Sequence, residues 1–452
     1  MAQADKRRGA PATVDAARQL AWGVLAAADR GGRINDLLHS ALDESSLSPQ
    51  ERRFTTELVL GSTRMRARLD ADLSACYQGR FGHLEQGVRH LLRMGAYQLD
   101  FMDSVPPHAA LDTTVNLARA NNLGRAAGLV NGVLRELSRR EPQSPPSDLS
   151  DPQALATAYS HPQWLVDRWI HQWGLDRAVA LLQWNNQSPT VWLRQRRDPD
   201  LRRQLAAVAA EKEVSLRPHG LLPDYVAVEP SPAPLLTTEV LAGGTFIVQD
   251  PSSGAVVAAI DPQLGETILD LCAGPGGKTA ALAEAVGPAG RVAACELDPK
   301  RITLINDTLN RLGLKNVDLF PGDALKTNLP APAKILIDAP CTGTGVAARR
   351  ADLRWRRQPE HLVEMAAMQL TLLERAAGLL PPGGLLVYAT CSLEPEENWD
   401  LVTTFQNRNP EYFLEAMPSG MPNEWVDERG ALSTLPPQHG VDGVFAVRLS
   451  KG

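Results

Sequence analysis

Two cysteines stand directly after apolar runs that are typical of buried β-strands. The run 335–337 leads through Asp338 to Cys341, and the run 386–390 leads to Cys391. If both runs belong to one parallel sheet, their carboxyl ends meet at the edge where such folds bind ligands. A cysteine thiolate at that edge is a candidate nucleophile, and the Asp338 carboxylate lies close to Cys341 in the chain.

The other three cysteines, Cys76, Cys272 and Cys295, bring the total to an odd five with no Cys-x-x-Cys pair. This pattern disfavours a disulfide framework and a structural zinc site, so we expect no metal. For Cys76 and Cys295 we expect the role of small core hydrophobes, the commonest role of a buried cysteine.

Residues 268–279, Ile-Leu-Asp-Leu-Cys-Ala-Gly-Pro-Gly-Gly-Lys-Thr, have the pattern of a strand, a glycine-rich turn and a helix. Glycines let the backbone approach a ligand closely, and the start of a helix offers free N–H groups. A triphosphate loop needs a glycine where Cys272 stands, and a dinucleotide loop needs a third glycine where Thr279 stands. An adenosine ligand without a pyrophosphate is therefore expected.

Acidic residues end three successive predicted strands: Asp270, Glu296 and Asp323. A carboxylate about twenty residues after such a loop accepts hydrogen bonds from both ribose hydroxyls, which is the role expected of Glu296. Asp323 is placed to meet the adenine amino group. S-adenosylmethionine fits this set best, because its cationic sulfonium and its ribose suit carboxylates and it carries no phosphate.

A cysteine beside a methyl donor suggests a reaction that needs a covalent nucleophile. Carbon-5 of a pyrimidine is too weak a nucleophile to attack a sulfonium, but a thiolate added to carbon-6 makes carbon-5 enamine-like. Methyl transfer and loss of the carbon-5 proton then follow. The adduct needs an acid near ring nitrogen 3, and Asp338 is the candidate. The residues alone do not decide which of Cys341 and Cys391 is the nucleophile.

The elements that position these residues lie in the second half of the chain. Short apolar runs predict strands over 245–248, 267–271, 291–295, 317–320, 334–337 and 385–389, with helices over 277–286, 298–312 and 360–379. This alternation is typical of an α/β domain with a doubly wound, Rossmann-like parallel sheet, which we place at residues 236–452.

The chain of 452 residues is too long for one ordinary domain. Residues 1–145 have an all-helical pattern, with apolar residues at helical spacing from Leu84 to Met102 and further helices expected from Pro106 and Gly128. The Pro- and Ser-rich stretch 141–148 is typical of a linker. Residues 150–235 hold five of the nine tryptophans, which we expect to form the core of a small α+β domain.

The composition excludes some classes of protein. Hydrophobic residues make up 44% of the chain, which argues against general disorder, and no apolar run reaches the ~18 residues of a membrane span. The first residues have no apolar signal core, so we expect a cytoplasmic protein with no membrane partner. We also expect it to be a monomer.

Three motifs in this order, Asp-Leu-Cys-Ala-x-Pro-Gly-Gly-Lys-Thr, Asp-Ala-Pro-Cys and Ala-Thr-Cys-Ser, resemble those of the Nol1/Nop2/Sun family of RNA cytosine-5 methyltransferases. Gln249–Gly254 resembles the element before their cofactor loop. The N-terminal helices, with His108-Ala-Ala-Leu-Asp and Val130-Asn-Gly-Val-Leu-Arg, resemble the RNA-binding antitermination factor NusB. The combination is similar to the bacterial Sun/RsmB branch, whose members methylate a cytosine of 16S ribosomal RNA.

The resemblance implies roles for individual residues. Cys391 corresponds to the nucleophile and Cys341 to the cysteine that helps to release the product. Asp338 would contact the base and the methionine part of the cofactor, and Lys278 would orient the base or the cofactor. The residues that would hold S-adenosylmethionine are Cys272, Ala273, Gly274, Pro275, Gly276, Gly277, Lys278, Glu296, Asp323 and Asp338.

The formal net charge of −6 argues against a nucleic-acid partner, but the charge is unevenly distributed. Residues 1–141 carry a net charge of +3, and the remainder carries −9. Two stretches, 194–203 and 349–357, hold five arginines each, and Trp355 lies in the second. We expect these arginines to contact phosphates and Trp355 to stack on an unpaired base of ribosomal RNA. The target cytosine must be single-stranded or flipped to reach a thiolate.

Two other functions stay open on the residues alone. One is an NTP-driven enzyme that uses Gly277-Lys278-Thr279 with Asp338 as a metal ligand, against which Cys272 argues. The other is an RNA-binding assembly factor whose methyltransferase fold is vestigial, against which the intact motifs argue.

Overall fold

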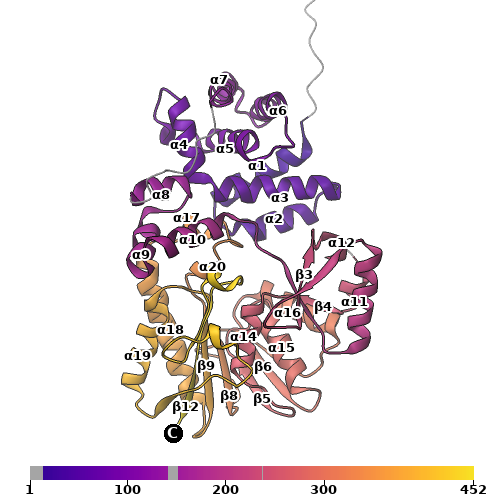
Figure 1. The fold of residues 1–452 in the computed structure, drawn as a ribbon, viewed down its shortest axis with the longest axis vertical. Coiled ribbons are helices and arrows are strands. Elements are labelled where there is room, and N and C mark those ends of the chain that lie inside the picture. Colours follow the sequence, from indigo (N-terminus) through magenta and orange to yellow (C-terminus); the bar gives the residue numbers. More distant parts are fainter. Residues whose placement is uncertain (1–13, 141–150, 237) are drawn as a thin grey trace, which may run out of the picture. The chain divides into compact units, whose positions relative to one another are not determined.

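The computed structural model describes residues 14–140, 151–236 and 238–452 (Figure 1). The N-terminal residues 1–13 and the predicted linker 141–148 therefore lie outside the described residues. Within the described ranges, no helix is long and apolar enough to cross a membrane. The chain divides into two compact units: the part up to Gln187 together with residues 347–356, and residues 188–346 together with 357–452.

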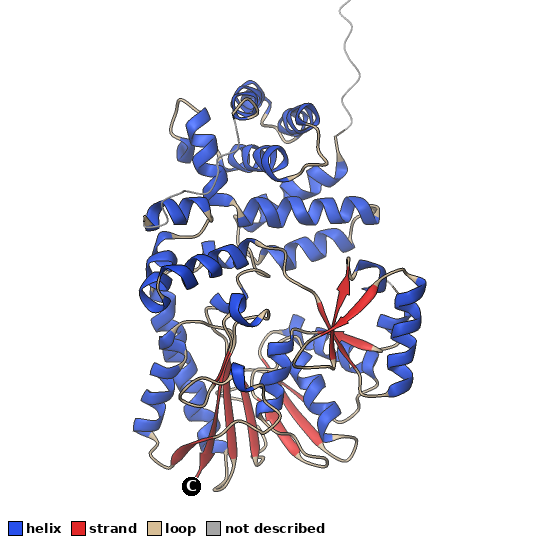
Figure 2. Cartoon of the chain, viewed as in Figure 1, coloured by secondary structure: helices blue, strands red, loops and turns tan. Residues whose placement is uncertain are grey.

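The first unit is helical throughout its described residues (Figure 2). Its helices are α1 (Ala16–Ala28), α2 (Ile34–Asp43), α3 (Pro49–Arg64), α4 (Arg66–Cys76), α5 (Gln86–Phe101), α6 (Pro107–Ala120), α7 (Ala127–Leu137), α8 (Pro152–Ala158), α9 (Gln163–Trp173), α10 (Leu175–Asn186) and α17 (Leu353–Arg356), with the 3-10 turns η1 (Phe81–His83) and η2 (Gly124–Ala126).

Local sequence signals explain where these helices begin. The Asp15 side chain accepts a hydrogen bond from the Arg18 N–H at the start of α1, and Ser48 and Glu51 form a capping box at the start of α3. Pro107 occupies the first turn of α6. One apolar core joins α1–α7, which confirms the predicted all-helical N-terminal domain, and the half-buried Cys76 packs against that core.

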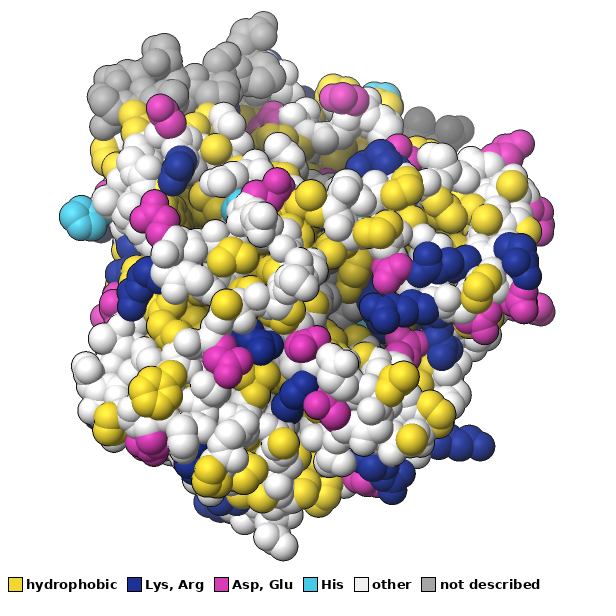
Figure 3. Space-filling view, turned by 60° about the horizontal axis from the view of Figure 1, so that its bottom comes forward, with side chains coloured by type: hydrophobic (Ala, Val, Ile, Leu, Met, Phe, Trp, Pro, Cys, Tyr) yellow, Lys and Arg dark blue, Asp and Glu magenta, His cyan; other side chains and the backbone are white. Residues whose placement is uncertain are grey.

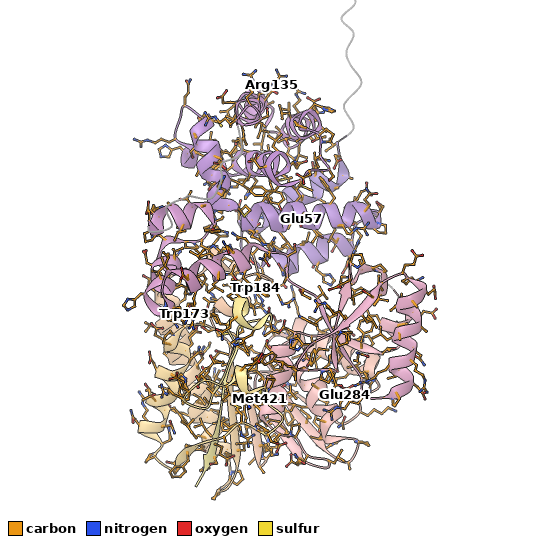
Figure 4. All side chains as sticks on the ribbon, viewed as in Figure 1. Glu57, Arg135, Trp173, Trp184, Glu284 and Met421 are labelled. Carbon is orange, nitrogen blue, oxygen red and sulfur yellow. The ribbon has the colours of Figure 1, made fainter. Side chains whose placement is uncertain are left out.

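The five tryptophans of residues 164–192 do not form one core, contrary to our expectation. Trp169 is fully buried in α9 and contacts the rings of His161 and Trp173 in the first unit. Trp173 and Trp184 come from α9 and α10 (Figure 4) and are partly exposed. Trp192 belongs to the second unit, where it packs against β-strand residues. Aromatic content alone does not reveal which elements share a core.

A small antiparallel sheet opens the second unit, with strand order β2-β3-β1-β4. Its elements are β1 (Trp192–Gln195), α11 (Pro199–Glu211), β2 (Ser215–Pro218), β3 (Tyr225–Glu229), α12 (Ala233–Leu236), α13 (Glu239–Ala242) and β4 (Phe246–Val248). The run 245–248 was expected in the parallel sheet. It pairs antiparallel with β1 instead, because Phe246 completes the apolar core of the small sheet while Val248 stays exposed.

The large sheet has the order β10-β12-β9-β8-β5-β6-β7. Its strands are β5 (Thr267–Asp270), β6 (Arg291–Glu296), β7 (Val317–Pro321), β8 (Lys334–Asp338), β9 (Leu385–Thr390), β10 (Tyr412–Glu415), β11 (Leu432–Ser433, paired with β12) and β12 (Phe445–Lys451). The helices and turns are α14 (Pro251–Ala259), α15 (Gly277–Val286), α16 (Pro299–Leu312), η3 (Thr344–Val346), α18 (Glu360–Leu379), η4 (Pro395–Glu397), α19 (Trp399–Arg408), η5 (Asn423–Trp425) and α20 (Pro436–His439).

Alternating residues of each central strand face opposite layers of helices. Leu269, Ile335 and Tyr388 pack in the core that includes α18 and α19, whereas Ile268 and Leu336 pack in the core with α14 and α15. The parallel strands β5–β9 confirm the doubly wound fold. The antiparallel β12 and β10 extend this sheet, so it is mixed rather than wholly parallel.

Candidate active site

The predicted site residues meet where the order of the large sheet reverses. β5 pairs in parallel with β6 on one side and with β8 on the other, and β8 pairs in parallel with β9. The carboxyl ends of these strands lie along one edge, the place where doubly wound sheets bind ligands. Asp270, Glu296 and Asp338 end β5, β6 and β8, and Cys391 directly follows β9.

The turn between β5 and α15 depends on two glycines in the left-handed region. Gly274 has a φ of 57° and Gly276 a φ of 89°, values that other residues rarely adopt. A Cβ atom on Gly276 would lie 3.2 Å from the Cα of Ile305. Because α15 begins at Gly277, its first N–H groups have no partner within the helix and are available to a ligand.

We expect Gly276→Ala to weaken binding of S-adenosylmethionine and to destabilise the fold by about 1–2 kcal/mol, the cost of a left-handed non-glycine residue. Gly378→Ala is the matched control, because Gly378 lies in α18 with open space around its Cβ position. That control should stabilise by about 0.4–1 kcal/mol. Calorimetric titration and chemical denaturation measure both effects. Unchanged cofactor affinity in Gly276→Ala would contradict this role of the turn.

Asp270 and Thr279 join the strand to the helix below this turn. Asp270 is fully buried and accepts a hydrogen bond from Thr279 Oγ1 at 2.7 Å. Burial raises the pKa of Asp270 to about 7. Cys272, two residues after Asp270, is also shielded from solvent. Burial is the main cause that raises the pKa of its thiol, and the charge of Asp270 is the second. Cys272 is therefore held as a neutral thiol.

Glu296 is buried at the end of β6 and holds the glycine turn from the other side. Its Oε2 accepts a hydrogen bond from the Gly274 N–H at 2.8 Å, and its Oε1 accepts one from the Asp298 N–H at 2.9 Å. A carboxylate has about four lone-pair sites, so both oxygens keep acceptor capacity for ribose hydroxyls.

Asp323 lies beyond β7, the strand next to β6. The Gly322 N–H donates to the Glu296 carbonyl at 2.9 Å, which brings the two acidic segments together. Asp323 Oδ1 accepts the Leu325 N–H at 3.0 Å, and Lys326 lies 3.5 Å from its other oxygen. Its side chain is 35% exposed, so it remains accessible to a ligand.

The two cysteines predicted from their strand ends lie side by side. Cys341 Sγ and Cys391 Sγ are 3.1 Å apart and are not joined in a disulfide. The pKa of Cys341 is raised well above its usual value, first by the hydrogen bond with Cys391 and then by burial. The pair can therefore hold one thiolate while Cys341 keeps its proton.

Lys278 and Asp338 form an ion pair beside the cysteines. Lys278 Nζ lies 2.7 Å from Asp338 Oδ2. Burial by itself would lower the pKa of Lys278, but the attraction of Asp338 and then of Cys391 outweighs it, so the pKa is raised. A charged ammonium near Cys391 favours the thiolate form of that cysteine.

Glu397, which belongs to none of the sequence motifs, connects the two cysteine loops. It is fully buried and accepts hydrogen bonds from the Thr342 N–H at 2.8 Å and from Gln369 Nε2 at 2.9 Å. The hydroxyls of Thr342 and Ser392 also donate to Glu397. Since Thr342 follows Cys341 and Ser392 follows Cys391, one carboxylate fixes the spacing of both. The neighbouring Glu394 and Glu396 are also acidic, so no local sequence signal marked Glu397.

Two arginines of the stretch 349–357 are held by contacts within the protein, so the predicted RNA contacts stay a prediction for the others. Arg354 is fully buried in the first unit, where it donates to the Asn185 carbonyl at 2.7 Å and to Asn186 Oδ1 at 2.8 Å. Burial lowers its pKa to about 9. Arg357, in the second unit, donates to the carbonyls of Thr342 and Cys341 at 2.9 and 3.0 Å.

Arginines in the stretch 194–203 also have carboxylate partners within the protein. Arg194 and Arg196 lie 2.7 and 2.6 Å from Glu284 on α15, which is labelled in Figure 4. Arg202 pairs with Asp224 at 2.5 Å. Basic and acidic side chains are interspersed on the surface in Figure 3. Charge counts along the chain therefore overstate the arginines that are available to RNA.

Solved structures share this architecture. The crystal structure of PH0851 matches with a TM-score of 0.82 at 24% identity, over 97% of this chain and 100% of its own. A methyltransferase homolog protein from Pyrococcus horikoshii matches with a TM-score of 0.56 at 25% identity, over 67% of this chain and 99% of its own. The doubly wound sheet, the glycine turn and the acidic strand ends define a methyltransferase that uses S-adenosylmethionine.

Family models match the chain in three places: the NusB family over residues 15–139, the RsmF/B-like ferredoxin-like domain over 161–232 and the 16S rRNA methyltransferase RsmB/F over 257–450. The probable ribosomal RNA small subunit methyltransferase B of Synechocystis sp. is 34% identical, over 96% of this chain and 99% of its own. Its counterpart in Bacillus subtilis is 32% identical, over 92% of this chain and 94% of its own. The chain belongs to the family of ribosomal RNA small subunit methyltransferases B.

Proposed function

We propose that this chain transfers a methyl group to carbon-5 of a cytosine in 16S ribosomal RNA through a covalent adduct with Cys391. The observation that carries the proposal is the pair of thiols 3.1 Å apart, beside the Lys278–Asp338 ion pair. Methylation of an amine or a hydroxyl needs no thiol nucleophile, whereas carbon-5 of a pyrimidine does. The relatives supply the substrate class, because they are named as ribosomal RNA methyltransferases.

The residues present suit S-adenosylmethionine. The turn at Gly274 and Gly276 leaves the backbone open to close approach, and the carboxylates of Glu296, Asp323 and Asp338 suit its ribose, adenine and cationic parts. When bound, it would supply an electrophilic methyl group on a sulfonium, whose sulfur can accept the electron pair of the carbon–sulfur bond.

The chain's own residues carry the remaining steps. The Cys391 thiolate, stabilised by the Lys278 ammonium, forms a bond to carbon-6 of the cytosine. Asp338 contacts the base near ring nitrogen 3, and its hydrogen bond from Lys278 connects it to a proton source. After carbon-5 has gained the methyl group, it loses its proton to a base, and the electron pair of that bond expels the Cys391 thiolate. Cys341 lies within reach of Cys391 to assist this release.

The substrate cytosine is single-stranded or flipped in this proposal, because a stacked base hides carbon-6 from a thiolate. The active form is a monomer in this proposal.

Methylation of unmodified 16S ribosomal RNA with methyl-labelled S-adenosylmethionine, followed by bisulfite mapping, tests the proposal. We expect label in the RNA and one cytosine that resists deamination, because a carbon-5 methyl group slows bisulfite conversion. Label on RNA in which every cytosine still converts would assign the methyl group to another atom and would overturn the proposal.

A further inference from the structure

A cavity of about 150 Å³ lies within the first unit, whereas the cysteine pair belongs to the second unit. Four arginines line it: Arg66 at the start of α4, Arg89 and Arg93 on α5, and Arg356 at the end of α17. Trp355 forms a further part of its wall. A single water needs about 10–15 Å³ of such volume, so this arginine pocket has room for a group much larger than water.

Two of these arginines have carboxylate partners. Arg93 donates to both oxygens of Asp70 at 2.6 and 2.8 Å, and Arg356 lies 3.2 Å from Asp352. His90, also in the wall, contacts Asp29 at 2.7 Å, yet burial lowers its pKa below the ordinary value. His90 is therefore neutral at pH 7, and the positive charge of the pocket comes from arginine.

Arg66 and Arg89 have no ion pair or side-chain hydrogen bond with any described residue. The Nε of Arg89 is buried without a partner. The guanidinium of Arg66 lies 5.4 Å from the centre of the Trp355 ring, and burial, followed by repulsion from Arg93, lowers its pKa. Asp70 and Asp29 attract the charge of Arg66 only in part, because neither Arg66 nor Arg89 is in an ion pair with a described carboxylate. An anion within the cavity would stabilise both guanidinium groups.

Trp355 is held so that its ring lines the pocket. Its indole N–H donates to the Thr63 carbonyl at 2.7 Å, which fixes the ring while leaving it partly exposed. Arg357, two residues after Trp355, donates a hydrogen bond to the carbonyl of Cys341. The wall of the pocket and the Cys341 loop thus belong to one continuous segment.

We propose that the arginine pocket binds a phosphate group of the RNA substrate, with Arg66 and Arg89 as its ligands and the adjacent base against Trp355. Guanidinium groups bind phosphate through paired N–H donors, and aromatic rings stack on bases of any sequence. The inference rests on the proposed function for the identity of the RNA. It adds a second contact region for the substrate, outside the methyl-transfer site.

Filter binding of unmodified 16S ribosomal RNA to the full chain over a range of salt concentrations tests this site. In the double variant Arg66→Gln/Arg89→Gln we expect the Kd for RNA to rise about tenfold or more, and the slope of log K against log salt to fall in magnitude by about 0.7, the value for one phosphate of a single strand. The matched control, Arg119→Gln/Arg125→Gln, removes two exposed arginines of the same unit outside the pocket.

Unchanged RNA affinity in the pocket variant, or an equal loss of affinity in the control pair, would overturn the proposal. It would also be overturned if inorganic phosphate or adenosine monophosphate stabilised the protein thermally through Arg66 and Arg89, but RNA affinity did not depend on these two arginines. The variant Arg66→Lys/Arg89→Lys guards against misfolding, because it keeps both charges and should retain most of the salt slope. The binding assay does not depend on methyl transfer. If the RNA were methylated at an atom other than carbon-5, the proposed function would be contradicted, but the assay would still test this site.

Discussion

Replacing Cys391 by serine is expected to abolish methylation, by about 10³-fold or more, and to abolish the covalent RNA adduct. A serine hydroxyl in the same position does not ionise near neutral pH, so the charge of Lys278 has no thiolate to stabilise. Replacing Cys341 by serine should instead leave adduct formation intact and let the adduct accumulate, because release of Cys391 is impaired.

Denaturing gel electrophoresis of protein incubated with ribosomal RNA and S-adenosylmethionine separates these outcomes, since an adduct survives denaturation. Cys76→Ser is the matched control: Cys76 is half-buried in the first unit and should affect neither methylation nor adduct. Adduct accumulation in Cys391→Ser would exchange the two roles. Absence of adduct in both variants, with methylation retained, would exclude a thiolate mechanism.

Replacing Glu397 by alanine should lower kcat about 10²-fold while leaving KM for S-adenosylmethionine nearly unchanged. Glu397 does not reach the reacting atoms, but it accepts hydrogen bonds from residues adjacent to both cysteines. Without it the two loops lose their common anchor, and a displacement of about 1 Å at a reacting group costs a factor of this order.

The kinetic split distinguishes this positioning role from general destabilisation. Glu397→Gln keeps the volume and one acceptor oxygen, so it should recover part of kcat, and it should slow adduct formation rather than adduct release. Glu364→Gln, an exposed carboxylate on α18, serves as the control. If Glu397→Ala changed only the stability of the fold, with normal kcat at low temperature, the carboxylate would have no positioning role.

The large sheet shows why much of the fold could be predicted. β5, β6, β7, β8 and β9 begin at the predicted residues, and α15 and α18 have the predicted bounds. Buried parallel strands are short apolar runs bounded by turn residues, and this pattern is local in the chain. The strands β10 and β12 were not predicted, because they pair antiparallel at the end of the sheet and their runs are less continuously apolar.

The charged residues show where prediction from the sequence ends. The stretches 194–203 and 349–357 have similar arginine content, but their arginines have different partners. Arg194 and Arg196 pair with Glu284. Arg354 is buried and donates hydrogen bonds to Asn185 and Asn186. These partners are far away in the chain, so their position could not be derived from local pattern. The same holds for the pocket around Arg66 and Arg89, which combines helices α1–α5 with residues of a distant segment.

The sequence by itself therefore determined which functional group stands at the carboxyl end of each strand: a glycine turn after β5, an acid at the end of β6 and a cysteine after each of β8 and β9. Turn geometry and strand burial depend on residues that are neighbours in the chain, so these features can be predicted from the local sequence. Only the tertiary structure decided that the two thiols lie 3.1 Å apart, that Glu397 anchors both loops and that Arg66 and Arg89 line one pocket. Distances and charge compensation depend on which distant side chains the fold brings into contact, and no local pattern encodes that.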